Sequence, residues 1–365
     1  MKHFFFAIIT LCATSIHAQE TKDVQKPRES GHVDSNKFRQ MYDLLATPNM
    51  YRTAAGAPGP AYYQQQADYK IDLELDDRKQ ILYGSEVITY TNNAKESLEY
   101  LWVQLDQNIL SRTSKTPLVT SDKTQPSMGV QGFSRSYLEQ KFDGGFKLDY
   151  VKDANGKIMK TTVNETMMRI DLDKPLKHSE KISFSIKWNY NINNYMLDGG
   201  RSGYEHFDKD GNNLYVLAQF YPRMAVYNDV EGWQNMQFWG TGEFALPFGN
   251  YEVNITVPAD HILDATGVLQ NRSEVYTPAE MERYNKALNS FESPVVIVTQ
   301  AEATAKESTF SDKKKTWKFK AENVRDFGIS TSRKFILDMM AVKMNDKTVM
   351  AVSLYPKEGN PLWEQ

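Results

Sequence analysis

Apolar and polar residues alternate with a period of two along much of this chain, and this pattern constrains its fold most. Tyr69, Ile71, Leu73 and Leu75 alternate with polar residues over 68–76, which is typical of a strand with one buried and one solvated face. Similar alternating or short apolar runs follow at 81–91, 101–105, 168–172, 182–188, 251–257, 295–298 and 317–319. Many such strands joined by short polar turns predict an antiparallel β sandwich or saddle.

Turn and helix signals separate these runs. Residues 153–156, 198–200 and 210–212 combine Asp or Asn with Gly, which favours tight turns. Thr277, Pro278 and Glu280 form a capping box with Pro at the first helical position, which predicts a helix between two strands. The expected fold class is therefore mainly β with few short helices.

The first 18 residues have the features of a secretion signal. Lys2 and His3 precede an apolar run over 4–13, which is too short to span a bilayer, and Ala18 offers a small residue for cleavage. We expect an exported product in the periplasm, in the cell envelope or outside the cell. Residues 19–64 are interpreted as a polar leader, a short helix starting near Ser35 and a Pro-containing linker.

Composition excludes several classes of function. The sequence holds 43 basic and 46 acidic residues, a net charge of −3, so no global field favours nucleic acid. No later segment is long and apolar enough to span a membrane. Cys12 is the only cysteine and lies in the signal, so a disulfide scaffold, a Cys nucleophile and a Cys-ligated metal are excluded from the mature chain.

No catalytic centre is visible from the residues themselves, and we expect no metal site in this chain. His178, His206 and His261 are far apart in sequence, and no two histidines stand four residues apart on a predicted helix. A site that folding assembles from these three remains an alternative, but single histidines are usually surface groups or hydrogen-bonded core groups.

Two other motifs have simpler interpretations. The stretch that starts at Gly240 matches a dinucleotide fingerprint, but Pro247 and Gly249 would break the helix that the motif needs, so we expect a loop. Residues 208–212 resemble part of a calcium loop without its closing Glu, and a hairpin turn accounts for them.

Several segments in a fixed order carry a resemblance to a known family. They are LAQFYPRMAVYND at 217–229 with Gly232 and Trp233, GNYEVNITVP at 249–258, LDATG at 263–267, SLEYLWVQLDQN at 97–108, and 322–335. Together they resemble the N-terminal saddle domain of the aminopeptidase N family of zinc metallopeptidases, in particular its Bacteroidetes-type branch. The resemblance covers residues 65–365.

The resemblance implies a two-part plan. Residues 65–330 would form the family's N-terminal β domain, and residues 331–365 would begin an incomplete thermolysin-like α/β catalytic domain. The family's zinc ligands lie in a His-Glu-x-x-His motif and a more distant Glu, whose first Glu activates zinc-bound water. That motif does not occur in the 365 residues. We therefore expect a truncated, inactive piece of a zinc aminopeptidase, with zinc and peptide substrates implied for its full-length parent.

One residue of this chain takes a role from the resemblance. In the family, a Glu or Gln of the saddle domain helps to hold the free α-amino group of the substrate, because an ammonium needs hydrogen-bond acceptors. Gln219 is the candidate, although its spacing to Pro222 is shorter than usual and an ordinary strand Gln is the alternative. Glu205 and Glu243 are weaker candidates. Arg223, Asp229 and Trp233 are interpreted as a structural corner.

A second function stays open. A secreted β-sandwich that binds a partner without catalysis would also explain the export signal, the aromatic residues and the lack of a catalytic motif. An independently active hydrolase is the third and weakest hypothesis. We also expect rapid hydrogen exchange after Arg333, because the strands and helices that would pack on this segment are missing.

Overall fold

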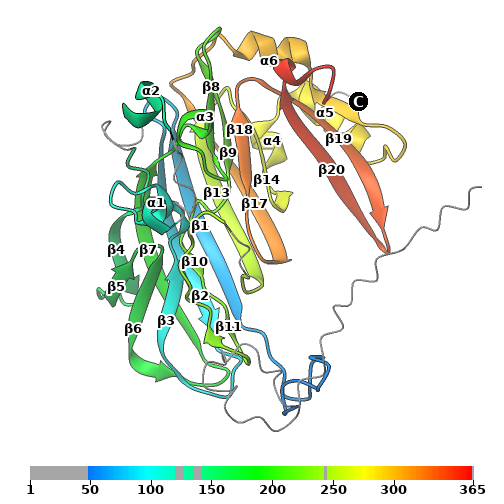
Figure 1. Cartoon of the computed structure of the whole chain (residues 1–365). Helices are drawn as coiled ribbons and strands as arrows, with labels where there is room; N and C mark the ends of the chain where they lie inside the picture. The colour runs from blue at the N-terminus through cyan, green and yellow to red at the C-terminus, as the bar shows by residue number, and fades with distance from the viewer. Residues whose placement is uncertain (1–47, 120–126, 135–141, 242–244, 364–365) are drawn as a thin grey trace, which may run out of the picture.

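The computed structural model describes residues 48–119, 127–134, 142–241 and 245–363. The predicted signal peptide, the leader and the helix near Ser35 lie outside these residues, as does Glu243. Strands dominate the described chain, and the helices are short (Figure 1). The predicted fold class, mainly β with several antiparallel sheets, is confirmed.

A seven-stranded sheet forms the largest layer, and the β1–β2–β7 ladder at its centre is antiparallel. In spatial order its strands are β15 (Val268–Leu269), β17 (Lys314–Val324), β13 (Gly249–Pro258), β1 (Gln66–Asp76), β2 (Ile81–Thr91), β7 (Lys181–Asn191) and β4 (Lys147–Asp153). The β1–β13 pair is parallel, with Tyr69 opposite Tyr251, and is an exception to the antiparallel prediction. Parallel pairing is possible here because a long stretch of chain separates the two strands.

Two four-stranded sheets complete the sandwich, and the second of them lies at the end of the molecule that is uppermost in Figure 1. The first contains β10 (Arg223–Met224), β3 (Leu98–Gln104), β6 (Met167–Leu176) and β5 (Lys160–Asn164). The second contains β14 (Ile262–Ala265), β18 (Ile329–Ser332), β9 (Asn212–Leu217) and β8 (Gly203–Phe207). The hairpin β11 (Tyr227–Asn228) and β12 (Gly232–Trp233) follows β10.

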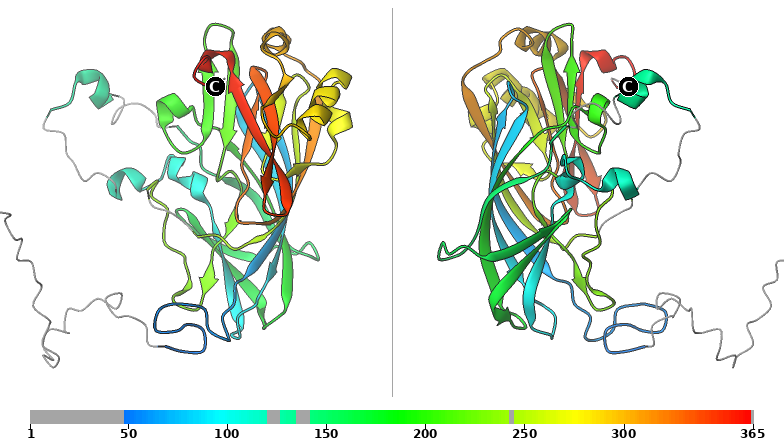
Figure 2. Two further views of the ribbon diagram at one scale, coloured as in Figure 1. Left: turned by 90° about the vertical axis from the view of Figure 1, so that its right-hand side faces the viewer. Right: turned by 60° about the vertical axis from the view of Figure 1, so that its left-hand side comes forward.

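A three-stranded sheet and the helices α5 and α6 lie together on one side of the molecule (Figure 2). The sheet contains β16 (Val295–Val298), β19 (Phe335–Met344) and β20 (Lys347–Pro356), and α5 packs against β16 and β19. The helices are η3 (Asp106–Leu110), α1 (Thr116–Val119), α2 (Val130–Phe133), α3 (Tyr195–Asp198), α4 (Arg272–Val275), α5 (Pro278–Ala287), α6 (Gln300–Lys306) and η5 (Lys357–Gly359). The capping box of Thr277 and Glu280 is confirmed at the start of α5.

The last part of the described chain belongs to the common core. The boundary that we predicted at residue 330 falls within β18, which pairs with β9 and β14. Phe335, Leu337 and Tyr355 are buried and belong to the same hydrophobic cluster as the side chains of β1 and β13. The segment after Arg333 therefore has packing partners, and the expectation of rapid exchange throughout this segment loses its physical basis.

Candidate functional site

Gln219 lies in the bend between β9 and β10, and its backbone has an unusual conformation. Its φ angle is +56°, in the left-handed region that side chains other than glycine rarely adopt. The residue is only 8% exposed. Its side-chain amide forms no hydrogen bond with any residue that the structure describes. Such strained residues persist only where the surrounding structure holds them in place, and they gather at functional sites.

Arg223 anchors the segment that follows Gln219. Its guanidinium is fully buried and donates from Nε (3.1 Å) and Nη2 (2.8 Å) to Oδ2 of Asp106. It also donates from Nη1 to Oδ2 of Asp326 at 2.6 Å. Burial acts to lower the pKa of Arg223, but the charges of Asp106 and Asp326 outweigh it and raise that pKa. This charged network ties β10 to η3 and to the loop before β18.

Tyrosines complete the anchor. Tyr221 donates a hydrogen bond of 3.0 Å to Oδ1 of Asp326, and its hydroxyl lies 3.0 Å from that of Tyr251. The hydroxyl of Tyr69 accepts from the backbone N–H of Met224 at 2.9 Å, and its ring stacks on that of Tyr251. The chain after Gln219 is therefore held by both strands of the parallel β1–β13 pair, which explains how an unfavourable backbone angle is maintained.

The other two residues of the predicted structural corner also have structural partners. Asp229 accepts hydrogen bonds from Nε (2.7 Å) and Nη2 (2.9 Å) of Arg52, in the segment before β1. The ring of Trp233 contacts those of Tyr227 and Tyr90. The interpretation of Arg223, Asp229 and Trp233 as a structural corner is thus confirmed.

Glu205, the weaker candidate, lies on a different surface from Gln219. It is exposed on β8 and lines a groove of about 360 Å³, which Gln219 does not line. The groove is largely apolar, and its lining includes Leu214 and Val216 of β9, Phe335 of β19 and Leu354 of β20. The structure therefore does not bring Glu205 and Gln219 together into one site. Glu243 lies outside the described residues.

His178, His206 and His261 do not form a cluster with one another. His178 Nδ1 lies 2.9 Å from the carbonyl oxygen of Ala94, and His206 Nδ1 lies 2.8 Å from the side chain of Asn213. His261 is fully buried, and its Nδ1 lies 3.1 Å from Oγ1 of Thr331. Within the described ranges, no group of potential metal ligands contains a histidine.

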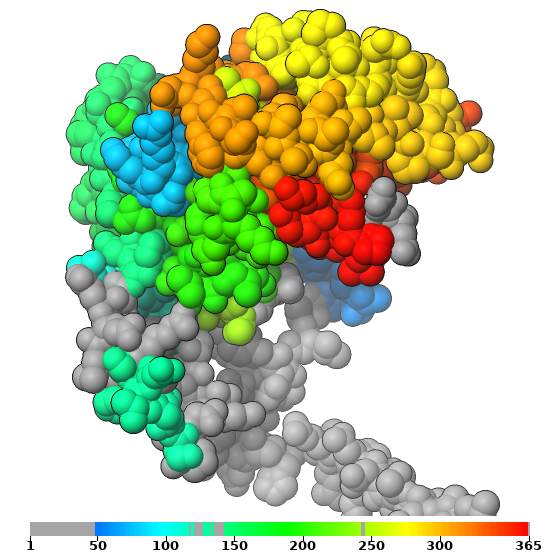
Figure 3. All heavy atoms as spheres, turned by 90° about the horizontal axis from the view of Figure 1, so that it is seen from above, coloured from blue at the N-terminus to red at the C-terminus, as the bar shows by residue number. Residues whose placement is uncertain are grey.

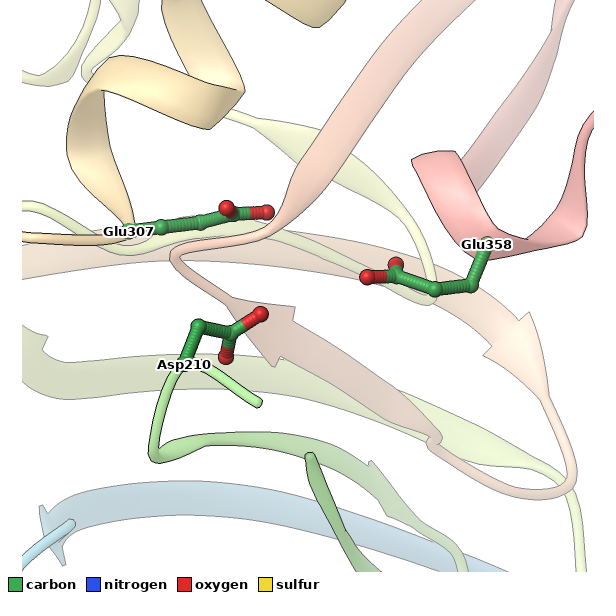
Figure 4. A group of neighbouring side chains, drawn as sticks. All are labelled: Asp210, Glu307 and Glu358. Carbon is green, nitrogen blue, oxygen red and sulfur yellow. The ribbon is translucent and has the colours of Figure 1, made fainter. Parts of the chain in front are cut away.

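One group of carboxylates has the spacing of a metal site, and a lysine is bound between them. Asp210, Glu307 and Glu358 converge from the β8–β9 turn, the end of α6 and η5 (Figure 4). Lys334 Nζ, which is fully buried, lies 2.9 Å from Glu307 and 2.9 Å from Glu358 and is also hydrogen-bonded to Asp210. Burial acts to lower the pKa of Lys334, and the carboxylates outweigh it and raise that pKa.

This carboxylate group does not fit zinc. The ammonium of Lys334 already supplies the positive charge, and it occupies the position that a cation would need. Histidine and cysteine, the usual ligands of zinc, are absent from the group. The four members of this cluster are spread over residues 210–358, and no local sequence motif links them.

No family model matches this chain, and no curated protein matches it. Among solved structures, a point mutant of an M1 zinc metallopeptidase from Deinococcus radiodurans is 13% identical, with a TM-score of 0.41, over 80% of this chain and 47% of that one. The same enzyme bound to a Tyr-Ser-Ala substrate is 13% identical, with a TM-score of 0.42, over 80% and 48%.

A two-domain M1 zinc metallopeptidase bound to L-tryptophan is also 13% identical, with a TM-score of 0.41, over 82% of this chain and 50% of that structure. The chain thus spans about half the length of these structures. In the described part of the chain, no helix meets the length and hydropathy needed to cross a membrane.

Proposed function

We propose that this chain is the non-catalytic N-terminal part of an exported zinc aminopeptidase. In this proposal it works with a zinc-bearing catalytic domain that its 365 residues do not contain, and the complete protein removes N-terminal residues from peptides. The support comes from the order of the sequence segments at 97–108, 217–229, 249–258 and 263–267, which resembles the aminopeptidase N family. The mainly β architecture is consistent with the family's saddle domain.

The conformation of Gln219 carries the proposal. This residue lies at the position where the resemblance implies contact with the substrate amine. It combines a left-handed backbone, an amide without a hydrogen-bond partner in the described structure, and a firmly held following segment. The amide of Gln219 has no hydrogen-bond partner among the described residues, so it is available to form hydrogen bonds with a ligand.

The chemistry of an amide suits an ammonium ligand. The side-chain oxygen of Gln219 is an acceptor with two lone pairs, and an α-ammonium brings three donors. A neutral amide avoids the penalty of an unpaired buried charge when no substrate is bound. Gln219 would therefore select for a substrate with a free N-terminus, although its own side chain is an uncharged amide. Other groups would have to balance the positive charge of the substrate ammonium.

Two parts of the proposal rest on the sequence. Export rests on the apolar run at 4–13 and the small residue Ala18. The zinc requirement rests on the family resemblance, since the carboxylate group around Lys334 does not fit zinc. No catalytic step is assigned to residues of this chain.

The coding sequence after codon 365 provides the first test. We expect an in-frame His-Glu-x-x-His motif within about a hundred codons. The purified 365-residue chain should hold no stoichiometric zinc and release no amino acids from peptides. Stoichiometric zinc together with chelator-sensitive release of amino acids by this chain alone would refute the proposal.

The role of Gln219 is tested in the complete protein. We expect Gln219→Ala to lower kcat/KM for unblocked peptides by about 10- to 100-fold, as for the loss of one or two hydrogen bonds to a charged group. Gln219→Glu should retain most activity. Gln80→Ala is a matched control, because Gln80 also has a positive φ (+52°) but its amide donates to the carbonyl of Asp77. An equal loss in both Ala variants would assign Gln219 to structure alone.

A secreted binding module is the second candidate function. It is favoured by a single observation: β8 is the last strand of its sheet, and a trough of about 720 Å³ lies beside it.

A further inference from the structure

Strand β8 is an edge strand with backbone groups that face outward. It is the last strand in the order β14–β18–β9–β8. The backbone N–H of Tyr204 donates to the carbonyl of Asn193 at 2.9 Å, so this N–H points away from β9. Because backbone direction alternates along a strand, the N–H and C=O of His206 face the same open side. No described residue forms a backbone hydrogen bond with either group of His206.

The segment before α3 pairs with the edge of β8 at one position only. Asn194 forms a parallel bridge with Tyr204. The side chain of Asn194 then accepts hydrogen bonds from the N–H groups of Met196 and Leu197 and so caps α3. The helix diverts the chain after one bridge, and the next pairing position along β8, that of His206, stays without a strand partner.

A trough of about 720 Å³ adjoins this position. It is bounded by the β1–β2 turn at Asp77 and Arg78, by α3 at Met196, and by β8 at His206. Figure 3 shows this end of the molecule from above, with the segment around residue 78 in blue and the segment around residue 205 in green. Met196 is 68% exposed and Leu197 is 61% exposed. The trough therefore lies between the outward-facing backbone groups of His206 and the exposed apolar side chains of Met196 and Leu197. A peptide that adds a strand to a sheet uses both kinds of contact.

The charges around the trough favour a basic occupant. Glu205 and Asp208 line it, and neither has a Lys or Arg partner in the part of the chain that the structure describes. Asp208 lies 3.7 Å from His206, which adds positive charge only when that ring is protonated. Arg78 also lines the trough, but its charge is paired with Asp312.

We propose that this trough binds an extended peptide segment with a basic side chain, which adds a strand to β8. The backbone of one peptide residue pairs with the N–H and C=O of His206. The basic side chain lies near Glu205 and Asp208, and an apolar neighbour contacts Met196. This peptide site is separate from Gln219 and does not depend on the proposed aminopeptidase.

Titration of the purified chain with a synthetic peptide, acetyl-Thr-Val-Lys-Val-Lys-Val-Thr-amide, tests this proposal by fluorescence anisotropy and NMR shift mapping. We expect saturable binding with shifts around residues 194–208. N-methylation of alternate peptide amides on the edge facing β8 should weaken binding about tenfold, the loss of about one hydrogen bond. Replacing both Lys by Glu should weaken it by a similar factor.

Variants of the protein provide a matched pair. His206→Pro removes the N–H that faces the trough, at an edge position where proline is tolerated, and should weaken binding about tenfold. His206→Ala removes the same ring but keeps the N–H, and should weaken binding less than about threefold. If His206→Pro does not fold, the N-methylated peptide on the wild-type chain decides the question.

Several results would overturn the proposal. They are equal binding of the plain and N-methylated peptides, no binding of the plain peptide at 1 mM, or shifts confined to another surface. Self-association of the chain in sedimentation equilibrium, lost in His206→Pro, would assign the edge to a second copy of the chain instead. None of these results bears on Gln219, which is tested by activity of the complete protein.

Discussion

Arg223 and Glu86 are both charged residue types buried in the core, but their surroundings are opposite. Arg223 has two carboxylate partners that satisfy its guanidinium from two sides. Glu86, on β2, is 2% exposed, and neither of its carboxylate oxygens has a hydrogen-bond partner among the described residues. Burial raises the pKa of Glu86 well above its usual value. Ion pairing therefore stabilises the charged form of Arg223, whereas burial without a partner favours the protonated form of Glu86.

Removing the paired charge should have the largest effect. Arg223→Met leaves Asp106 buried without a partner, and we expect it to lower the free energy of unfolding by about 3–5 kcal/mol. Urea denaturation followed by far-UV circular dichroism measures this loss. The double variant Arg223→Met/Asp106→Leu should recover part of it, because the remaining carboxylate of Asp326 is partly exposed and no fully buried charge is left without a partner. A double variant that is no better than the single one would contradict the pairing argument.

Lys334 provides a second paired cation to set beside Arg223. Two of its three carboxylate partners are more exposed than Asp106, the buried partner of Arg223. The side chains of Asp210 and Glu358 are 20% and 39% exposed, so water can solvate them when the ammonium is lost. We expect Lys334→Met to lower the free energy of unfolding by about 2–3 kcal/mol, less than for Arg223→Met. The same denaturation experiment in low and high salt measures it, and a loss greater than that of Arg223→Met would reverse the ranking.

Replacement of Glu86 should have the opposite sign. Glu86→Leu removes two unsatisfied buried oxygens at similar volume, and we expect a gain of about 1–3 kcal/mol at pH 7. Because the folded-state pKa of Glu86 is raised, the stability linked to its proton is present at acid pH and is lost as pH rises. The gain should therefore grow as pH rises from the ordinary pKa of a glutamate toward the raised folded-state value. A variant that is less stable than wild type at pH 9 would show that Glu86 has a partner in solution.

Asp264 on β14 should show the smallest effect at acid pH. Burial raises its pKa to about 7, so its folded-state carboxyl is neutral at pH 5. The stability linked to its proton is complete below the unfolded-state pKa and declines as pH rises through about 7. Asp264→Asn should change the free energy of unfolding by less than about 0.5 kcal/mol at pH 3, below the unfolded-state pKa, and should stabilise the protein at pH 8. Parallel pH profiles for the two proteins would contradict this assignment.

The site was only partly predictable. Gln219 was singled out by its place in the 217–229 segment, and its left-handed backbone could not be read from the residues, since Gln has no preference for that region. The partners of Arg223 lie at Asp106 and Asp326, about a hundred residues away on either side. The Lys334 cluster and the open edge at His206 carried no sequence signal, because both depend on which strands become neighbours.

The sequence by itself determined the local structure of this protein. Alternation at Tyr69, Ile71, Leu73 and Leu75 set the buried face of β1, and Thr277 with Glu280 set the start of α5, because these choices depend on residues two to four positions apart. Only the tertiary structure decided the parallel pairing of β1 with β13 and the partners of its buried charges. Those contacts join residues far apart in the chain, where hydrophobic periodicity does not distinguish one partner strand from another.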